Sequence, residues 1–558
     1  MEQEVGDMNV SSPHLPAVKV AVVSSYTVDL IVRDAAQQLK NSGSEVEWFV
    51  TPFGQYRQEI LSNESALLKF QPNVILIALH GPELVENSLE ISDLLMAASS
   101  RFATSTILVH NCALLLPLPM KFLEWNSDRS VRRAAAEVNV ALSQLVSKLP
   151  NVHLLDLEEL VSRYGAEKMY DARLYYLAKM QFSPFGTQAI ATQLAWALLA
   201  IGGRRKKCLI LDLDNTLWGG ILGEDGVEHL RLSSDGEGKA FHDFQRHILA
   251  LTTTGTILAI CSKNDETPAL QAMDSHPDMI LRKEHFAAIR INWLDKSQNI
   301  RSIAEELNIG LDALVFLDDS PQERELVRIE LPAVTVPDLP NDPSAYPAFL
   351  ASLPYFETFS VTEEDASRRV MYAQERQRKE IQEGAKSVEE ALMSLQIKVL
   401  VQSASAFTIP RIAQLTQKTN QFNLSTKRYT EAEIRALSSD PHCIVLCVSA
   451  SDRLGDSGIV GVAILKTDTS PATIDTLLMS CRVLGRGIEQ ALVSVMQTIA
   501  QRHGTTTLAA EYVPTKKNGM VKKFLTENGF VSLNDQNKFV LEKSGEVPRW
   551  IKVQYEEF

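Results

Sequence analysis

Asp212 and Asp214, two aspartates separated by one residue, directly follow an apolar run at residues 208–211. A short apolar run of this kind predicts a buried strand, which delivers both carboxylates at its carboxyl end. Carboxylates that lie close together and face solvent bind a hard divalent cation, and Mg²⁺ is the cation that this arrangement favours. The pattern therefore predicts phosphoryl-transfer chemistry.

Three further groups have the residue types that such a site needs. Ser262 follows the apolar run 256–261, the pair Asp318 and Asp319 follows another apolar run, and Lys296 opens an amphipathic helix. In a parallel α/β sheet the carboxyl ends of the strands meet at one edge, where ligands bind. A carboxylate can attack a phosphate dianion only when a cation screens the repulsion. We therefore expect the four groups to form one site.

The elements that position these groups are apolar runs that alternate with helical patterns, which predicts parallel sheets covered on both faces. Strands are expected at residues 18–23, 45–49, 73–79, 105–109, 152–155, 208–211, 256–261, 313–317, 397–401, 444–448, 459–465 and 473–478. Helices are expected at residues 29–40, 130–148, 187–200, 362–382, 487–502 and 517–528.

The composition excludes several classes of protein. A chain of 558 residues with 45% hydrophobic and 22% charged residues is typical of a globular protein with three or four domains. Its net charge of −14 argues against nucleic-acid and membrane partners. The six cysteines form no metal-ligand pattern, and no membrane-spanning or signal-like apolar stretch is present. We expect a cytoplasmic protein.

Taken in order, the four polar groups resemble the motifs of the haloacid dehalogenase-like phosphotransferases. The resemblance implies that Asp212 is the nucleophile and Asp214 the general acid and base. It also implies that Ser262 and Lys296 hold the phosphoryl oxygens. The implied metal ligands are Asp212, the backbone carbonyl of Asp214, Asp318 and, through water, Asp319.

The segment after the first aspartates is short and rich in glycine, which predicts a tight turn and a hairpin. In the resembled superfamily this segment is a mobile flap, and its shortness here implies a small cap that leaves the site open to a macromolecular partner. The residues expected to contact substrate are Thr216, Trp218, Gly219, Gly220 and, from the next motif, Asn264.

The sequence of residues 211–226 is similar to that of the FkbH-like proteins of polyketide pathways, in subfamily IIIC of this superfamily. It reads Leu-Asp-Leu-Asp-Asn-Thr-Leu-Trp-Gly-Gly-Ile-Leu-Gly-Glu-Asp-Gly. Further matches lie at residues 261–264, 316–324, 414–423 and 479–487. The resemblance implies a glyceryl transferase. Such an enzyme takes 1,3-bisphosphoglycerate or a related phosphorylated acid, loads the phosphopantetheine thiol of an acyl carrier protein, and releases phosphate.

An enzyme-bound glyceryl thioester, which the resemblance implies, needs a cysteine. Cys261 is the first candidate because it adjoins Ser262, and Cys481 and Cys208 follow. The alternative is that each of these cysteines is a small buried apolar residue.

The last part of the chain resembles an N-acetyltransferase fold. Its R-x-x-G-x-G turn, at residues 482–487, follows an expected strand and precedes an expected helix. Backbone N–H groups at such a helix start bind pyrophosphate. The residues expected to hold a phosphopantetheine arm are Cys481, Arg482, Gly485, Arg486 and Gly487.

The first part of the chain resembles the SGNH-type hydrolases in outline only. Ser24 and Ser25 stand where a Gly-Asp-Ser block would be, and residues 171–174 lack the histidine of an Asp-x-x-His block. We therefore expect a docking or scaffold role without hydrolysis.

The predicted fold class is α/β with three domains. The predicted boundaries are a disordered tail at 1–17, a flavodoxin- or SGNH-like domain at 18–203, a haloacid dehalogenase-like domain with a small cap at 204–354, a helical connector at 355–394 and an N-acetyltransferase-like domain at 395–558. The predicted function is Mg²⁺-dependent glyceryl transfer to a carrier protein. The alternatives are a small-molecule phosphatase and a non-catalytic scaffold of a biosynthetic complex.

Overall fold

The computed structural model of the chain describes residues 18–555 apart from 116–117, 120, 129, 360, 362–370, 372–373, 375–376, 379–380, 383, 516, 534–536 and 542–545. The predicted tail at 1–17 and most of the helix predicted at 362–382 lie outside the described residues. The chain divides into two compact units, Met1–Leu199 with Tyr429–Ser439, and Ala200–Arg428 with Asp440–Phe558.

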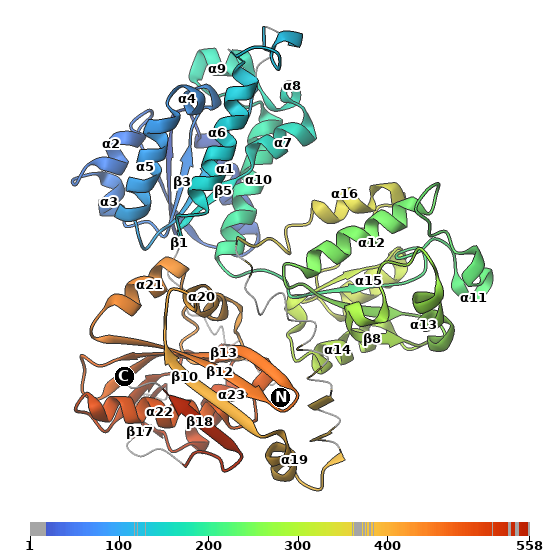
Figure 1. The fold of residues 1–558 in the computed structure, drawn as a ribbon, viewed down its shortest axis with the longest axis vertical. Coiled ribbons are helices and arrows are strands. Elements are labelled where there is room, and N and C mark those ends of the chain that lie inside the picture. The colour runs from blue at the N-terminus through green and yellow to red at the C-terminus, as the bar shows by residue number, and fades with distance from the viewer. Residues whose placement is uncertain are drawn as a thin grey trace, which may run out of the picture. The chain divides into compact units, whose positions relative to one another are not determined.

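The first unit is built on a parallel sheet in the order β2-β1-β3-β4-β5 (Figure 1). This is the flavodoxin-like strand order. The five strands lie within two residues of their predicted bounds, and they are β1 Val18–Ser24, β2 Val46–Val50, β3 Val74–Ala78, β4 Thr106–His110 and β5 Val152–Leu155. The likeness to SGNH-type hydrolases stays a prediction.

Helices cover both faces of this sheet because its strands are apolar on both sides. One face packs against α4, α5 and α6, and α1 is joined to α10 by a hydrogen bond from Gln38 Nε2 to Thr192 Oγ1 of 3.0 Å. The helices of the unit are α1 Asp29–Asn41, α2 Tyr56–Leu61, α3 Ala66–Phe70, α4 Gly81–Glu86, α5 Ser88–Arg101, α6 Val131–Val146, α7 Leu157–Tyr164, α8 Ala166–Met169, α9 Ala172–Ala178, α10 Pro184–Ile201 and α21 Glu431–Ser439.

The middle of the chain, in the second unit, forms a parallel sheet in the order β8-β7-β6-β9. The strands β6 Cys208–Leu211, β7 Ile257–Ser262 and β9 Leu314–Leu317 confirm the predicted apolar runs. A fourth strand, β8 Phe286–Ile291, was not predicted from the sequence and extends the sheet at its edge. The two central strands, β6 and β7, are buried along their whole length, as a parallel sheet with two covered faces requires.

Alternate residues of these strands point to opposite faces. Leu209, Leu211 and Ile260 pack with α12, α13 and α16, whereas Cys208, Ile210 and Cys261 pack with α14 and α15. The helices of this part are α11 Leu222–Asp225, α12 Lys239–Thr252, α13 Glu266–Ser275, α14 Lys296–Glu306, α15 Pro321–Glu330 and α16 Tyr346–Ala351. This alternation decides which side chains of a strand can reach its carboxyl end.

The last part of the chain forms a mixed sheet in the order β16-β17-β15-β14-β13-β12-β10-β18, with β11 paired to β14. Its strands are β10 Ile397–Ser403, β11 Phe422–Asn423, β12 Cys443–Asp452, β13 Gly455–Lys466, β14 Ala472–Met479, β15 Leu508–Glu511, β16 Val531–Ser532, β17 Lys538–Leu541 and β18 Ile551–Tyr555. Its helices are α19 Val388–Leu395, α20 Ile409–Lys418, α22 Ile488–Arg502 and α23 Gly519–Glu527.

β14 changes partner along its length. Its first residues pair with β15 in parallel, from Ala472 to Ile474, and its last two residues pair with β11 in antiparallel fashion. The buried Asn518 fixes the change, because its amide donates to the carbonyl oxygens of Asn423 and Val513 at 2.9 and 2.8 Å. The short strand β11 therefore fills the space where β14 and β15 diverge.

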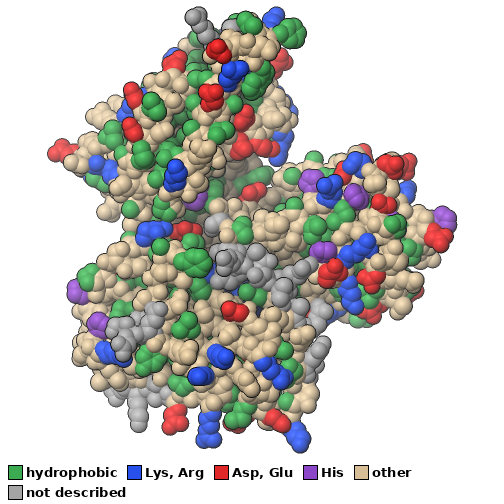
Figure 2. Space-filling view, viewed as in Figure 1, with side chains coloured by type: hydrophobic (Ala, Val, Ile, Leu, Met, Phe, Trp, Pro, Cys, Tyr) green, Lys and Arg blue, Asp and Glu red, His purple; other side chains and the backbone are tan. Residues whose placement is uncertain are grey.

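On the face shown in Figure 2, acidic and basic side chains are interspersed among the described residues. None of the described helices combines the length and the apolar character that crossing a membrane requires.

Asn518→Ala tests whether the side-chain amide of Asn518 stabilises the region where β14 and β15 diverge. Oδ1 of Asn518 accepts from Tyr512, from the Thr515 amide and from the Thr515 hydroxyl, so the substitution orphans buried groups on both sides. We expect the free energy of unfolding to fall by roughly 2–4 kcal/mol. Thermal denaturation followed by circular dichroism measures it. Asn528→Ala is the control, because it loses only the side-chain hydrogen bond to the Phe524 carbonyl oxygen at the end of the same helix. It should change the free energy of unfolding by about 1 kcal/mol or less.

Candidate active site

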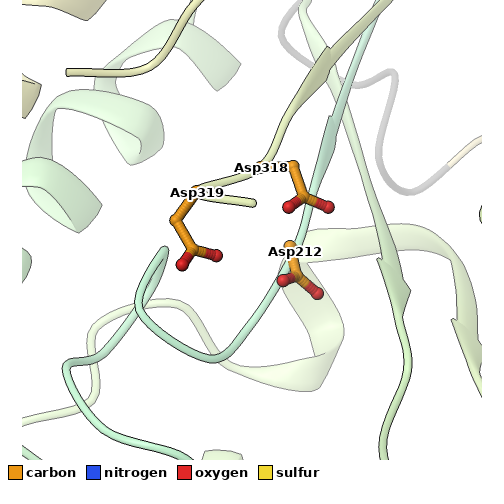
Figure 3. Close-up of side chains that lie close together, drawn as sticks. All are labelled: Asp212, Asp318 and Asp319. Atoms are coloured by element: carbon orange, nitrogen blue, oxygen red, sulfur yellow. The ribbon is translucent and has the colours of Figure 1, made fainter. Parts of the chain in front are cut away.

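Three carboxylates meet at the carboxyl edge of the middle sheet. Asp212 follows β6, and Asp318 and Asp319 follow β9, its neighbour in the sheet. One oxygen of each carboxylate lies within 4.8 Å of the others, and Figure 3 shows the three side chains turned toward one space. Asp212 and Asp318 are buried, with 6% and 0% of their surfaces exposed. The three aspartates therefore lie together at one sheet edge, as predicted from the sequence.

Lys296, the first residue of α14, supplies the positive charge that this cluster needs. Its Nζ lies 3.1 Å from Oδ1 of Asp212 and forms an ion pair with Asp318. Burial by itself lowers the pKa of Lys296, but the two carboxylates outweigh burial and raise that pKa. Conversely, burial and the nearby Asp212 raise the pKa of Asp318, although Lys296 opposes the shift. The ammonium group therefore neutralises only part of a crowded anionic site.

Asp214 lies beside the cluster and is held in place by its own set of donors. Its Oδ1 accepts from the Trp218 indole at 2.8 Å and from the Leu222 amide at 3.2 Å, and its Oδ2 accepts from Asn264 Nδ2 at 3.0 Å. Burial raises the pKa of Asp214 above the ordinary value for an aspartate. A carboxyl group with a raised pKa can hold and give up a proton, which suits a general acid.

Several residues expected to contact substrate hold other residues of the site in place. Thr216 and Trp218 are fully buried; the Thr216 hydroxyl accepts from the Asp319 amide at 3.2 Å, and the Trp218 indole holds Asp214. Asn264 is also buried and acts through Asp214. Gly219 is paired with Arg231 in both directions, at 3.1 and 2.8 Å. Thr216 and Trp218 act on the site through Asp319 and Asp214, and direct substrate contact by either residue stays a prediction.

The predicted hairpin after the aspartates is likewise replaced by another structure. A single bridge between Gly219 and Arg231 closes the segment, and the short helix α11 lies inside it. Gly220, whose backbone φ is +105°, donates its amide to the Asn215 side chain at 3.0 Å. The segment is a compact loop anchored to Asp214 and Asn215, because side-chain acceptors take the amides that a second strand would otherwise bind.

Ser262 and Cys261, at the end of β7, differ in what they can reach. Ser262 is the last residue of the strand, at the same sheet edge as the aspartates, and is buried. Cys261 faces α14, where its thiol donates to the Lys296 carbonyl oxygen over 3.6 Å, and burial strongly raises its pKa. Burial also strongly raises the pKa of the Cys208 thiol. Neither thiol is set up as a nucleophile, because the reactive form of cysteine is the thiolate.

The aspartate cluster fits a magnesium ion. The donor set consists of carboxylate oxygens, which are the hard ligands that Mg²⁺ prefers. Oδ1 of Asp212 is buried and has no hydrogen-bond donor, although the Lys296 ammonium group lies near it. An acceptor of this kind, beside two further carboxylates, is suited to a cation. Asp212, Asp318 and Asp319 would hold the ion, while the Asp214 side chain is committed to other donors.

Two hydrogen bonds near the site were not predicted from the sequence. The Tyr346 hydroxyl from α16 donates to the Asn215 carbonyl oxygen at 3.1 Å, and the exposed Trp293 donates its indole N–H to Asp265 at 2.9 Å. Tyr346 lies more than a hundred residues from its acceptor, so no local pattern could indicate the contact. Trp293 stands three residues before Lys296, and a large aromatic residue so close to a predicted motif was a usable signal.

The R-x-x-G-x-G turn of the last part has the expected position and shape. It lies between β14 and α22, and Gly485 and Gly487 have backbone φ of +76° and +87°. However, the turn is already filled, since the buried Glu489 accepts the Gly485 amide at 2.9 Å and is further bonded to the amides of Gly487 and Glu489. A phosphate group would have to displace this carboxylate.

The chain's own C-terminal segment also covers the turn. Trp550 donates its indole N–H to the Arg486 carbonyl oxygen at 2.7 Å, and a Cβ at Gly487 would come within 2.7 Å of Pro548. The geometry thus argues against phosphopantetheine binding by Gly485, Arg486 and Gly487. The sequence signal for the filled turn was an acidic residue in the first turn of the helix, where it favours free backbone amides.

Comparison with known proteins finds similarity to solved structures. No model of a known protein family matches the chain, and no curated protein matches it. The crystal structure of the N-terminal part of the protein BF1531 from Bacteroides fragilis, containing a phosphatase domain and complexed with Mg, is 31% identical with a TM-score of 0.58. The match covers 62% of this chain, which is more than the middle part alone, and 95% of that chain.

Two acetyltransferase structures match at lower similarity. The ribosomal-protein-S18-alanine N-acetyltransferase from Escherichia coli is 13% identical with a TM-score of 0.20, over 26% of this chain and 97% of that chain. The PaiA N-acetyltransferase from Thermoplasma acidophilum, in complex with coenzyme A, is 17% identical with a TM-score of 0.19, over 26% of this chain and 99% of that chain.

The parallel sheet, the order of its motifs and the aspartate cluster define the middle part as a haloacid dehalogenase-like domain. The chain belongs to the same family as the BF1531 protein of Bacteroides fragilis, of which it covers nearly the whole solved part at 31% identity.

Lys296→Gln is expected to make the protein more dependent on Mg²⁺. Without the ammonium group the three carboxylates repel one another, and no positive charge opposes the incoming ion. In EDTA the melting temperature should fall, and addition of Mg²⁺ should raise it by several degrees more than in the unchanged protein, or roughly 1–2 kcal/mol of extra stabilisation. Differential scanning calorimetry measures both shifts.

Lys239→Gln is the matched control, because Lys239 pairs with Asp243 on the exposed side of α12. Its response to Mg²⁺ should equal that of the unchanged protein. Equal Mg²⁺ shifts for Lys296→Gln and Lys239→Gln would contradict the assignment of the carboxylate cluster as the metal site.

The filled turn predicts that coenzyme A binds weakly. The carboxylate of Glu489 occupies the amides and repels phosphate, so we expect a Kd above about 1 mM by isothermal titration calorimetry. Glu489→Gln removes the charge and should tighten binding about tenfold. Micromolar binding by the unchanged protein would show that the turn opens.

Proposed function

We propose that this chain is a Mg²⁺-dependent enzyme that acts on a phosphorylated acid such as 1,3-bisphosphoglycerate, transfers its glyceryl group to the thiol of an acyl carrier protein, and releases phosphate. The observation that carries the proposal is the cluster of Asp212, Asp318 and Asp319, within 4.8 Å of one another and in contact with Lys296. The carrier protein and the glyceryl donor come from the sequence resemblance.

Asp212 is the nucleophile of the phosphoryl step. One of its oxygens attacks phosphorus, the bond from phosphorus to the leaving oxygen breaks, and Asp214 donates a proton to that oxygen. Asp214 then takes a proton from the water that hydrolyses the aspartyl phosphate. Lys296 and Ser262 offset the charge on the phosphoryl oxygens. A bound Mg²⁺ ion would screen the repulsion between the carboxylates and the phosphate.

The acyl step follows from the chemistry of an acyl phosphate, which is already activated. The carrier thiolate attacks the carbonyl carbon, and the carbon–oxygen bond to phosphate breaks. Burial of Cys261 and Cys208 supports direct transfer to the carrier thiol without an intermediate on either cysteine. Hydrolysis of the remaining phosphate ester is the step that needs Asp212.

A small-molecule phosphatase is the second candidate, and two observations favour it. The cysteines nearest the site are buried, and Glu489 fills the turn that was expected to hold a phosphopantetheine arm. A non-catalytic scaffold is less well supported, because Lys296 contacts both Asp212 and Asp318, and Asp214 is held in place two residues after Asp212.

One incubation separates these functions. The full chain is mixed with 1,3-bisphosphoglycerate, Mg²⁺ and a phosphopantetheinylated carrier protein, and the carrier mass and the released phosphate are measured together. Glyceryl transfer adds the glyceryl mass to the carrier. Phosphate release without a mass change in any carrier tried favours the phosphatase, and the absence of both favours the scaffold.

Asp212→Asn should lower enzyme-dependent release of the ester phosphate by at least about 10³-fold, since an amide is not a nucleophile for phosphorus. Asp235→Asn, an exposed residue of the same domain, is the control and should retain full activity. A phosphomolybdate assay on a stable phosphate monoester measures the rates. Undiminished turnover by Asp212→Asn would disprove the role of Asp212.

A further inference from the structure

A cavity of about 350 Å³ lies at the opposite edge of the middle sheet from the aspartates. Lys207, Ile257 and Ala313 line it at the amino ends of β6, β7 and β9, and Met479 and Cys481 line it from the end of β14 and the turn that follows. Its volume falls within the range of small-molecule sites, roughly 300–1,000 Å³. From Lys207 to Asp212 the extended chain spans about 16 Å. A ligand in the cavity therefore cannot reach Asp212.

The cavity is strongly basic, although the chain as a whole carries a net charge of −14. Five basic side chains line it, against a single acidic one, Asp312, among the described residues. The basic residues are Lys207, Arg411, Lys418, Arg482 and Lys517. Basic groups gathered in a partly enclosed space concentrate anions.

The walls of the cavity are tied together by hydrogen bonds. Lys207 Nζ donates to the Lys418 carbonyl oxygen at 2.8 Å, and Asn308 Nδ2 donates to the Cys481 carbonyl oxygen at 2.6 Å. Lys517 pairs with Asp312. Because these contacts join both sides of the cavity, its shape is set before a ligand arrives, which lowers the cost of binding.

The remaining lining residues indicate what else the ligand carries. Ile309, Leu311 and Leu415 provide an apolar surface. Gln421 also lines the cavity, and its Oε1 atom is buried without a hydrogen-bond partner. An orphaned acceptor of this kind needs a donor from a ligand or a water.

We propose that this cavity is a second ligand site, which binds a small organic anion with a phosphate or carboxylate group, a short apolar part and a hydrogen-bond donor. The anionic group lies among the basic side chains, and the apolar part lies against the leucines and isoleucines. The site is separate from the aspartate cluster, so the inference does not depend on the proposed function.

Cys481 provides a direct readout of the site. It is the half-buried cysteine of the six, and the other five are buried. Iodoacetate and iodoacetamide are of similar size and alkylate a thiolate by displacing iodide, but only iodoacetate is an anion. The ratio of their rates at Cys481, compared with the ratio for glutathione, measures the local field. Peptide mass spectrometry gives both rates on the full chain.

We expect the ratio to favour iodoacetate over the glutathione value. Lys418→Gln and Arg482→Gln each remove one positive charge and should lower the ratio roughly two- to fivefold. Lys523→Gln, an exposed lysine of α23 outside the cavity, is the control and should leave it unchanged. A ratio equal to that of glutathione, or one insensitive to Lys418 and Arg482, would overturn the proposal.

Protection experiments in EDTA then test ligand binding. Phenylphosphonate and benzoate carry an apolar ring with a phosphonate or a carboxylate, and benzamide is the neutral control. At least one anion should slow iodoacetamide at Cys481 about fivefold or more, and that protection should be lost in Lys418→Gln. The more protective anion identifies the preferred headgroup. If neither anion protects, or if benzamide protects equally, the cavity is not an anion site.

Discussion

The balance of charge between Lys296 and the carboxylates of Asp212 and Asp318 governs the middle domain. Two buried carboxylates at one sheet edge repel each other, and a single buried ammonium group within 3.1 Å of Asp212 compensates them only in part. Asp319 adds a third carboxylate and no further cation is supplied by the described residues of the cluster. The site is therefore electrostatically incomplete, which is what a metal-assisted phosphoryl-transfer site requires before its ion and substrate arrive.

The surrounding residues keep this charged arrangement rigid. Thr216 positions Asp319, and Trp218 and Asn264 position Asp214, so that buried polar groups support the reacting ones from beneath. Burying these supports costs little because each is paired, whereas an unpaired polar group in the same place would be destabilising. The motif at residues 212–218 therefore includes residues that hold the reacting groups in place as well as residues that can contact a phosphate.

The two edges of the same parallel sheet carry opposite charge. The carboxyl edge holds aspartates and suits a cation, whereas the amino edge borders a cavity with Lys207, Arg411, Lys418, Arg482 and Lys517. In the last part of the chain, Glu489 fills the turn before α22 and β11 fills the gap beside β14, while Arg411, Lys418, Arg482 and Lys517 line the basic cavity.

The sequence by itself determined β6, β7 and β9 and the order of the site's motifs along the chain, but it did not reveal β8 at the edge of the same sheet. Apolar runs of four to six residues, each followed by polar residues of the site, specified β6, β7 and β9. A buried parallel strand can be recognised in this way because its signal is local: a short hydrophobic run followed by a turn. Tertiary structure alone decided which face each strand residue takes, and so buried Cys261 under α14 instead of opening it to the site. It also decided that Thr216 and Trp218 hold other residues of the site in place and that Glu489 occupies the turn, since such roles depend on partners brought together by packing. Residue type and spacing predict which groups can do chemistry, but burial and hydrogen bonding decide which of them are free to do it.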